Sequence, residues 1–138
     1  AAGAKAVVGG GRPKALPKGW FIEPTVFANV DNSMKIAQEE IFGPVLSTIT
    51  FKDADEAVKI GNDTIYGLAA AVWTKDITKA FKASAALRAG VVWVNCFDNG
   101  SITSPFGGFK QSGFGRDKSL HAMEKYTELK ATWIHIGN

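Results

Sequence analysis

Hydrophobic and polar residues follow a regular order in the middle of the chain, from residue 45 to residue 94. Three apolar runs, Val45–Phe51, Leu68–Trp73 and Val91–Val94, have the composition of buried strands, and Leu68–Trp73 is continuous enough for a strand covered on both faces. A helical pattern separates each of these runs from the next. The order strand, helix, strand, helix, strand predicts a parallel α/β sheet.

Polar residues predict where the two helices begin. Asp53 and Glu56 have capping-box spacing, in which Asp53 accepts from the backbone at Glu56 and the Glu56 side chain reaches back. This helix is expected to stop at Gly61–Asn62. The second helix is expected to begin at either Asp76 or Thr74.

The region before residue 45 is less regular. Gly9, Gly10 and Gly11 break the chain, and the prolines that follow predict an irregular connection. Trp20–Ile22 and Thr25–Phe27 are β-prone pieces. Residues 31–33 are predicted to cap one short helical turn through Ala37.

The region after residue 94 begins with a glycine-rich loop that runs to about Asp117. Ser119 is predicted to cap a short helix whose inward-facing residues are Leu120, Met123 and Tyr126. The segment Glu128–Ile136 alternates as a strand does, and near its end it is apolar on both faces. We therefore expect another segment to cover this strand.

Composition excludes several classes of protein. The 138 residues are 46% hydrophobic and 21% charged, which is ordinary for a globular domain that buries a substantial core. The net charge is +3 with no Lys/Arg run, so neither nucleic acid nor a membrane is expected as a partner. Residues 1–8 resemble neither a signal peptide nor a membrane span. A single cysteine permits no intrachain disulfide and fits a cytoplasmic protein.

Two motifs stand out from this background. The first, Glu39-Glu40-Ile41-Phe42-Gly43-Pro44, places two carboxylates at the start of a strand, where they could hold a sugar hydroxyl, a metal or a proton, or form a solvated turn. It resembles a signature of the NAD(P)-dependent aldehyde dehydrogenases. The second motif, residues 104–113 (Ser-Pro-Phe-Gly-Gly-Phe-Lys-Gln-Ser-Gly), is similar to a late loop of the same family. The resemblance extends from about Gly19 to Ile136, in the family's order and spacing.

The resemblance implies an α/β fold built from parallel strand-helix-strand units of the aldehyde dehydrogenase catalytic domain. Residues 1–127 look like the C-terminal part of that domain, truncated at its N-terminal side, and residues 128–138 look like its C-terminal oligomerisation strand. The parent protein is then expected to be a homodimer or homotetramer. Its cofactor would be NAD or NADP, and the residues that choose between them lie outside this sequence.

The resemblance also assigns site residues. Glu40 matches a carboxylate that accepts hydrogen bonds from the nicotinamide ribose, and Phe42 matches a ring near the nicotinamide. Asp98, Gly100 and Phe106 match positions of the aldehyde entry loop. Because several relatives carry an aromatic residue at the position of Gly100, a wider pocket is expected here. The run from residue 115 to residue 125 is similar to the branch that acts on γ-glutamyl-γ-aminobutyraldehyde in polyamine breakdown.

No residue of this chain is expected to perform the covalent chemistry. Cys96 follows a predicted buried strand, and neither His121 nor His135 is near it in sequence, so nothing predicts a reactive thiolate. Neither histidine has partners at metal-ligand spacing, and no metal site is expected. Residues Gly108–Gly113 have phosphate-loop spacing, but Phe114 follows in place of lysine.

The nucleophilic cysteine and the general-base glutamate of the resembled family belong to earlier motifs that this sequence does not contain. The chain alone is therefore expected to be inactive. It would be part of an enzyme that oxidises an aldehyde to a carboxylic acid through a thioester. The alternative is a non-enzymatic structural or interaction domain derived from the same fold.

Overall fold

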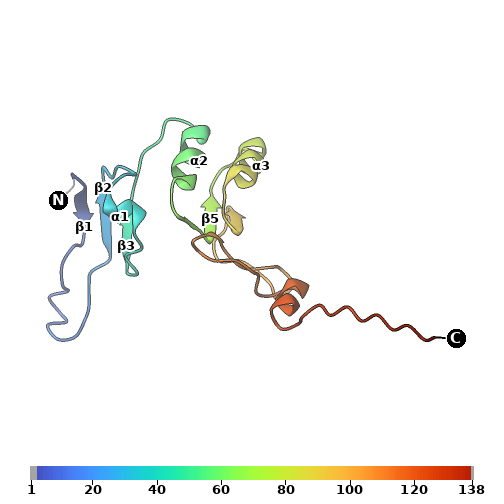
Figure 1. Ribbon diagram of the computed structural model, residues 1–138. Coiled ribbons are helices and arrows are strands. Elements are labelled where there is room, and N and C mark those ends of the chain that lie inside the picture. Colours follow the sequence, from blue (N-terminus) through green and yellow to red (C-terminus); the bar gives the residue numbers. More distant parts are fainter. Residues whose placement is uncertain (1–2, 138) are drawn as a thin grey trace. The chain divides into compact units, whose positions relative to one another are not determined.

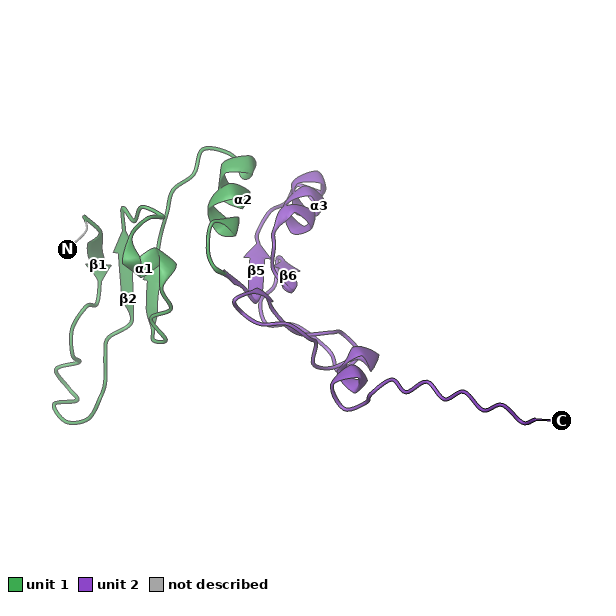
Figure 2. Ribbon diagram, in the orientation of Figure 1, with its two compact units in different colours: residues 1–65 green, residues 66–138 purple. Residues whose placement is uncertain are grey.

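The computed structural model describes residues 3–137, and the chain divides into two compact units, residues 1–65 and residues 66–138 (Figure 2). Each unit contains helices and strands, numbered in chain order, and Figure 1 labels several of them. Both units contain a parallel pair of strands, β2 with β3 and β5 with β6. The predicted α/β class is confirmed, and so is the parallel pairing of β5 with β6. The third predicted strand, β3, pairs with β2 instead and belongs to a different sheet.

A three-stranded sheet of order β1-β2-β3 organises the first unit. Strand β1 (Lys5–Val8) runs antiparallel to β2 (Thr25–Ala28), which runs parallel to β3 (Val45–Ser47). The predicted strand from residue 45 to residue 51 is thus shorter than expected. Its partner β2 ends at Ala28, and the next residue, Asn29, has a φ of 55° that turns the chain away, so the residues after Thr48 have no ladder to join. The β-prone piece Trp20–Ile22 forms no strand for a similar reason, since no ladder pairs with it.

Two helices belong to this unit, α1 (Lys35–Gln38) and α2 (Ala54–Asn62). The predicted cap of α2 is confirmed, because Asp53 accepts from the backbone N–H of Glu56 at 2.9 Å. The Glu56 carboxylate reaches back to the N–H of Lys52, at 2.6 Å. The predicted stop at Gly61–Asn62 is confirmed, since α2 ends at Asn62 and the backbone N–H of the capping residue Asp63 bonds the carbonyls of Lys59 and Ile60.

The expected cap of α1 by residues 31–33 is wrong. Asp31 instead makes a local turn, in which its carboxylate accepts from the hydroxyl of Ser33 at 2.6 Å and from its backbone N–H at 2.8 Å. Both hydrogen bonds lower the pKa of Asp31 below its usual value, and the bond from the Ser33 hydroxyl has the larger effect. The helix itself begins after Met34 without a side-chain cap.

The second unit contains β5 (Ala69–Val72), α3 (Ile77–Ala86) and β6 (Val91–Val94), a strand-helix-strand unit with parallel strands. The cap of α3 is Asp76, which accepts from the backbone N–H of Lys79 at 3.1 Å. Thr74, the other candidate, accepts from the N–H of Asp76 instead. A short antiparallel pair, β4 (Tyr66–Gly67) with β7 (Phe109–Lys110), completes the strands of this unit.

The predicted core is largely absent. Among residues 3–137 the buried apolar side chains are Val30 and Ala80. Strands β5 and β6 are half-buried along most of their length, although the sequence predicted strands with buried faces. The apolar faces of the strands and helices are present, but the described residues do not supply layers that would cover them.

The short helix after the glycine-rich loop is a 3₁₀ helix, η1 (Leu120–Lys125). Ser119 caps it as predicted, accepting from the backbone N–H of His121 at 3.3 Å. The expectation that its apolar residues face inward is wrong, because Leu120 and Tyr126 are 88% and 84% exposed.

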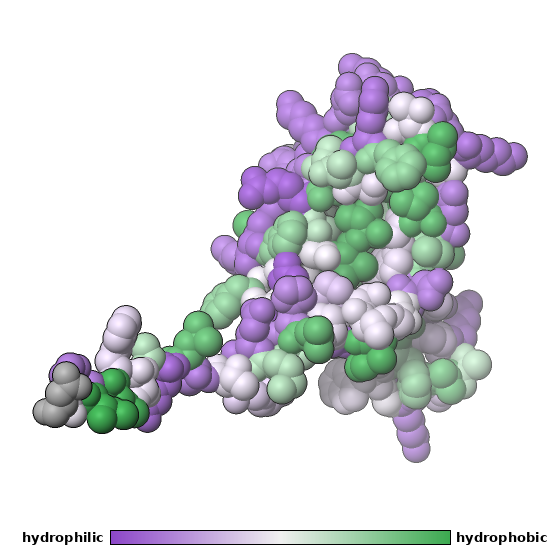
Figure 3. All heavy atoms as spheres, turned by 90° about the vertical axis from the view of Figure 1, so that its right-hand side faces the viewer, coloured by the Kyte–Doolittle hydropathy of each residue, from purple (hydrophilic) through white to green (hydrophobic). Residues whose placement is uncertain are grey.

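The C-terminal segment, residues 128–137, does not form the predicted strand. A strand requires a hydrogen-bonding partner, and none of the described residues pairs with this segment. Its apolar side chains are open to solvent, with Leu129 and Trp133 almost fully exposed. Figure 3 shows apolar side chains on the surface of the protein.

In the part of the chain that the structure describes, no helix has the length and apolar character needed to cross a membrane.

Candidate functional site

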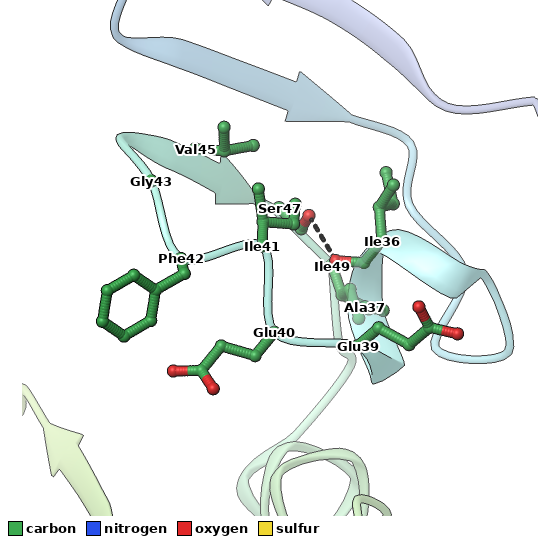
Figure 4. A pocket seen from close by; sticks show the side chains of 10 residues that line it. All are labelled: Ile36, Ala37, Glu39, Glu40, Ile41, Phe42, Gly43, Val45, Ser47 and Ile49. Atoms are coloured by element: carbon green, nitrogen blue, oxygen red, sulfur yellow. Dashed lines mark hydrogen bonds between the residues drawn. The ribbon is translucent and has the colours of Figure 1, made fainter. Parts of the chain in front are cut away.

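The turn that leads into β3 forms the first candidate site (Figure 4). The backbone at Phe42 has a φ of 54°, an uncommon conformation for a residue with a large side chain. Pro44 then joins the sheet, since its carbonyl accepts from the N–H of Thr25 at 2.8 Å. The turn borders a pocket of about 400 Å³ whose lining residues are Ile36, Ala37, Glu39, Glu40, Ile41, Phe42, Gly43, Val45, Ser47 and Ile49.

The two carboxylates of this turn differ in their surroundings. Glu39 is paired with Lys35, with 3.3 Å between the carboxylate oxygen and Nζ. Within residues 3–137, no hydrogen bond or ion pair occupies the carboxylate of Glu40. Figure 4 shows Glu40 and Phe42 projecting to one side of the turn and Glu39 to the other. A free carboxylate beside a ring that is 93% exposed can accept two hydroxyls and contact a flat ligand.

Hydrogen bonds between distant parts of the first unit hold the helix before this turn. The side-chain amide of Asn32 donates to both the carbonyl and the carboxylate of Asp63, at 3.0 and 2.9 Å. Gln38 at the end of α1 donates to the carbonyls of Asn32 and Asp63. On the sheet side, Ser47 donates to the carbonyl of Ile36 at 3.1 Å, the dashed line of Figure 4. The turn is thus fixed at its helix side and at its strand side.

A second pocket, of about 520 Å³, lies in the second unit where β6 gives way to the glycine-rich loop. It brings together the three predicted substrate residues, Asp98, Gly100 and Phe106. A Cβ placed at Gly100 would meet nothing within 4 Å, so this side of the pocket is open. The other lining residues are Val91, Val92, Trp93, Asn99, Ser101, Ser104, Pro105 and Lys118.

Backbone contacts hold the loop around this second pocket. Phe106 and Asp117 form an antiparallel bridge through two hydrogen bonds, at 2.8 and 2.7 Å. The indole N–H of Trp93 donates to the carbonyl of Asn99 at 2.7 Å. Asn95, at the end of β6, uses its side-chain amide to bond both backbone groups of Thr74 at 2.9 Å. The pocket is therefore built from segments that are separate in sequence.

Sequence reasoning assigned no role to one residue of this pocket, Lys118. Its Nζ lies 5.6 Å from the centre of the Phe106 ring, close enough for a cation–π contact. The bridge between Phe106 and Asp117 brings Lys118 to the pocket, and no local sequence pattern predicts that bridge. Only knowledge that Phe106 pairs with Asp117 would have placed Lys118 at this pocket.

Among the residues that the structure describes, Cys96 and His121 add no further candidate site. Cys96 is half-buried and unpaired. His121 lies 3.2 Å from Glu124 on the exposed surface of η1. Among residues 3–137, no group of three His, Cys, Asp or Glu side chains could hold a metal ion.

Comparison with known proteins identifies the family. The aldehyde dehydrogenase family model matches residues 1–132. An aldehyde dehydrogenase of Aspergillus niger is 53% identical over 137 residues, which are 99% of this chain and 27% of that protein. The chain therefore spans about a quarter of the length of such relatives.

Two solved structures are similar in sequence and in fold. Indole-3-acetaldehyde dehydrogenase in complex with NAD⁺ is 62% identical with a TM-score of 0.90, over 97% of this chain and 27% of that chain. The γ-glutamyl-γ-aminobutyraldehyde dehydrogenase of Burkholderia cenocepacia is 63% identical with a TM-score of 0.87, over 94% of this chain and 26% of that chain. The identities to these two structures, 62% and 63%, are too similar to decide which of the two dehydrogenases this chain resembles more. The family match covers nearly the whole sequence, and the chain belongs to the aldehyde dehydrogenase family.

Proposed function

We propose that this chain is the C-terminal part of a longer enzyme that oxidises an aldehyde to a carboxylic acid with NAD or NADP. The observation that carries the proposal is the free carboxylate of Glu40 beside the exposed ring of Phe42. A carboxylate can accept both hydroxyls of a ribose, and an aromatic ring can support a flat heterocycle. The NAD⁺ bound in the related indole-3-acetaldehyde dehydrogenase supports this use of the site.

The role of this chain would be to bind the nicotinamide cofactor and to orient its ring. When bound, the nicotinamide supplies the acceptor for the hydride that leaves the substrate. Glu40 would hold the ribose through charge-assisted hydrogen bonds, so that the ring stays in place while Phe42 covers one side of it. The thiolate that forms the thioester, and the general base, would come from the rest of the parent enzyme. Cys96 is not proposed as that nucleophile, because neither His121 nor His135 is near it in sequence.

The pocket at Asp98, Gly100 and Phe106 would admit the aldehyde. Phe106 supplies an apolar wall, and the open space at Gly100 leaves room for a long substrate. We propose a long, polar-tailed aldehyde such as γ-glutamyl-γ-aminobutyraldehyde, an intermediate of polyamine breakdown, and the 63% identity to that dehydrogenase supports this choice. We further propose a cytoplasmic homodimer or homotetramer, with residues 1–127 in the catalytic domain and residues 128–138 as the oligomerisation strand.

The parent reading frame provides the direct test. The full-length protein should reduce NAD or NADP when an aldehyde is added, and the 138-residue chain alone should not. Formation of reduced nicotinamide can be followed by absorbance. Failure of the full-length protein with every aldehyde would favour a structural or interaction role. Turnover by the 138-residue chain that persists in Cys96→Ser would also contradict the assignment of roles.

Replacing Glu40 with glutamine tests the cofactor site. Glu40→Gln keeps the size of the side chain but removes the charge, and a charge-assisted hydrogen bond contributes about 1.5–3 kcal/mol. We therefore expect cofactor binding or hydride transfer to weaken by about tenfold or more, measured at subsaturating cofactor. Glu39→Gln is the matched control, because Glu39 projects to the other side and is paired with Lys35. Equal effects of the two substitutions would remove Glu40 from the site.

A further inference from the structure

The second pocket carries two opposite charges, Asp98 and Lys118, and both side chains are exposed to solvent. No ion pair joins them, although they line the same pocket. Gly100 lines the same pocket, and a Cβ placed there would meet nothing within 4 Å. The pocket therefore presents an anion and a cation to whatever enters it.

The carboxylate next to Lys118 in sequence, that of Asp117, is already paired with Lys125 and does not pair with Lys118. The carboxylate of Asp117 lies 2.6 Å from Nζ of Lys125, the last residue of η1. Lys118 forms no ion pair within residues 3–137, and its ammonium group makes a cation–π contact with the Phe106 ring. An incoming carboxylate would thus meet an ammonium group that no carboxylate of the described residues neutralises.

The position of Lys118 is fixed by its backbone. The bridge between Phe106 and Asp117 ends immediately before it, and the N–H of Ser119 donates to the carbonyl of Ile102 at 2.7 Å immediately after it. The φ of Lys118 is 59°, so the chain turns sharply between these two contacts. Asp98 has a similar φ, of 52°. Both charged residues therefore stand on turns that the surrounding hydrogen bonds hold in place.

We infer that Asp98 and Lys118 select aldehydes whose far end carries both an ammonium and a carboxylate group, as an α-amino acid does. Lys118 would bind the carboxylate and Asp98 the ammonium, while the reacting end passes along Phe106. A γ-glutamyl tail belongs to this class because its α-amino and α-carboxyl groups are free. A substrate with a neutral tail would form no ion pair with Asp98 or Lys118, and both side chains would stay hydrated. The inference rests on the proposed aldehyde oxidation and specifies the substrate class for the same pocket.

The first measurement uses the unaltered full-length enzyme. γ-Glutamyl-γ-aminobutyraldehyde is compared with two analogues of equal length, one with the α-carboxylate converted to an amide and one with the α-amine acetylated. Each analogue loses one charge-assisted contact, so KM should rise by about tenfold while kcat changes little. Higher salt should raise the KM of the zwitterionic aldehyde and reduce this difference.

Variants then assign the carboxylate to Lys118. Lys118→Met should raise KM for the zwitterionic aldehyde by about tenfold more than for its amide or for propanal. Lys118→Arg keeps the positive charge and should restore most of the loss. The control is Lys82→Met in α3, an exposed lysine away from this pocket, which should affect all aldehydes equally.

Three results would overturn the inference. One is an amide that the unaltered enzyme binds as well as the acid. Another is a loss in Lys118→Met that is the same for the acid, the amide and propanal. In both cases oxidation of propanal would still support the proposed function. A full-length protein that oxidises no aldehyde would overturn the inference and the proposed function together.

Discussion

Replacing Gly90 with alanine is expected to destabilise the full-length protein and to disturb the aldehyde pocket. A Cβ at this position would lie 1.6 Å from the carbonyl oxygen of Gly107 and 2.8 Å from its carbonyl carbon. Backbone atoms cannot give way as a flexible side chain does, so Gly107 must move, and Phe106 with it. Overpacking of this kind costs about 3 kcal/mol at the upper end of its usual range. Thermal unfolding and the KM for aldehyde both measure the effect.

Gly100→Ala is the matched control for this stability measurement. It lies in the same unit, and its Cβ would meet nothing within 4 Å. Its thermal midpoint should stay close to that of the parent sequence. If Gly90→Ala unfolds at the same temperature as Gly100→Ala, the close approach of β6 to the loop at Gly107 is wrong.

Removal of residues 128–138 from the full-length protein should yield monomers or insoluble protein. The segment exposes four large apolar side chains, Leu129, Trp133, Ile134 and Ile136, and none of the described strands pairs with it. An apolar segment with an unpaired backbone is stabilised when it adds to the sheet edge of another subunit. Size-exclusion chromatography with light scattering gives the subunit count.

Point substitutions separate the role of the apolar side chains from that of chain length. Trp133→Ser together with Ile134→Ser should weaken the assembly. Lys130→Gln, in the same segment, should leave the assembly intact because it removes no apolar contact. A truncated protein that stays soluble with the subunit count of the intact protein would contradict the role given to this segment.

Local interactions explain which parts of the fold the sequence predicted correctly. The caps of α2 and α3 depend on Asp53 and Asp76, each bonding a backbone N–H three residues away. Strand β6 has the bounds expected from its apolar run, Val91–Val94. Such features need only a few neighbouring residues, so the order of side chains determines them.

Features that depend on distant partners were not predicted. The third strand ends at Ser47 because β2 turns away at Asn29, and the C-terminal segment lacks a ladder altogether. The same limit applies to the sites. Asp98, Gly100 and Phe106 line one pocket because all three lie in one loop, and their role in substrate binding stays a prediction. Lys118 was missed because a bridge across that loop places it there.

The nearly absent core has a thermodynamic consequence for this sequence. With Val30 and Ala80 as its buried apolar side chains, the described part of the chain removes little apolar surface from water when it folds. Most of the stabilising surface must then come from contacts with other stretches of protein. For the 138-residue chain taken alone, the folded population would be governed by mass action, and it would rise with the concentration of whatever covers β5 and β6. In this respect the chain alone would behave as one half of a complementation pair, and its melting temperature would report how much of it is bound to its partner.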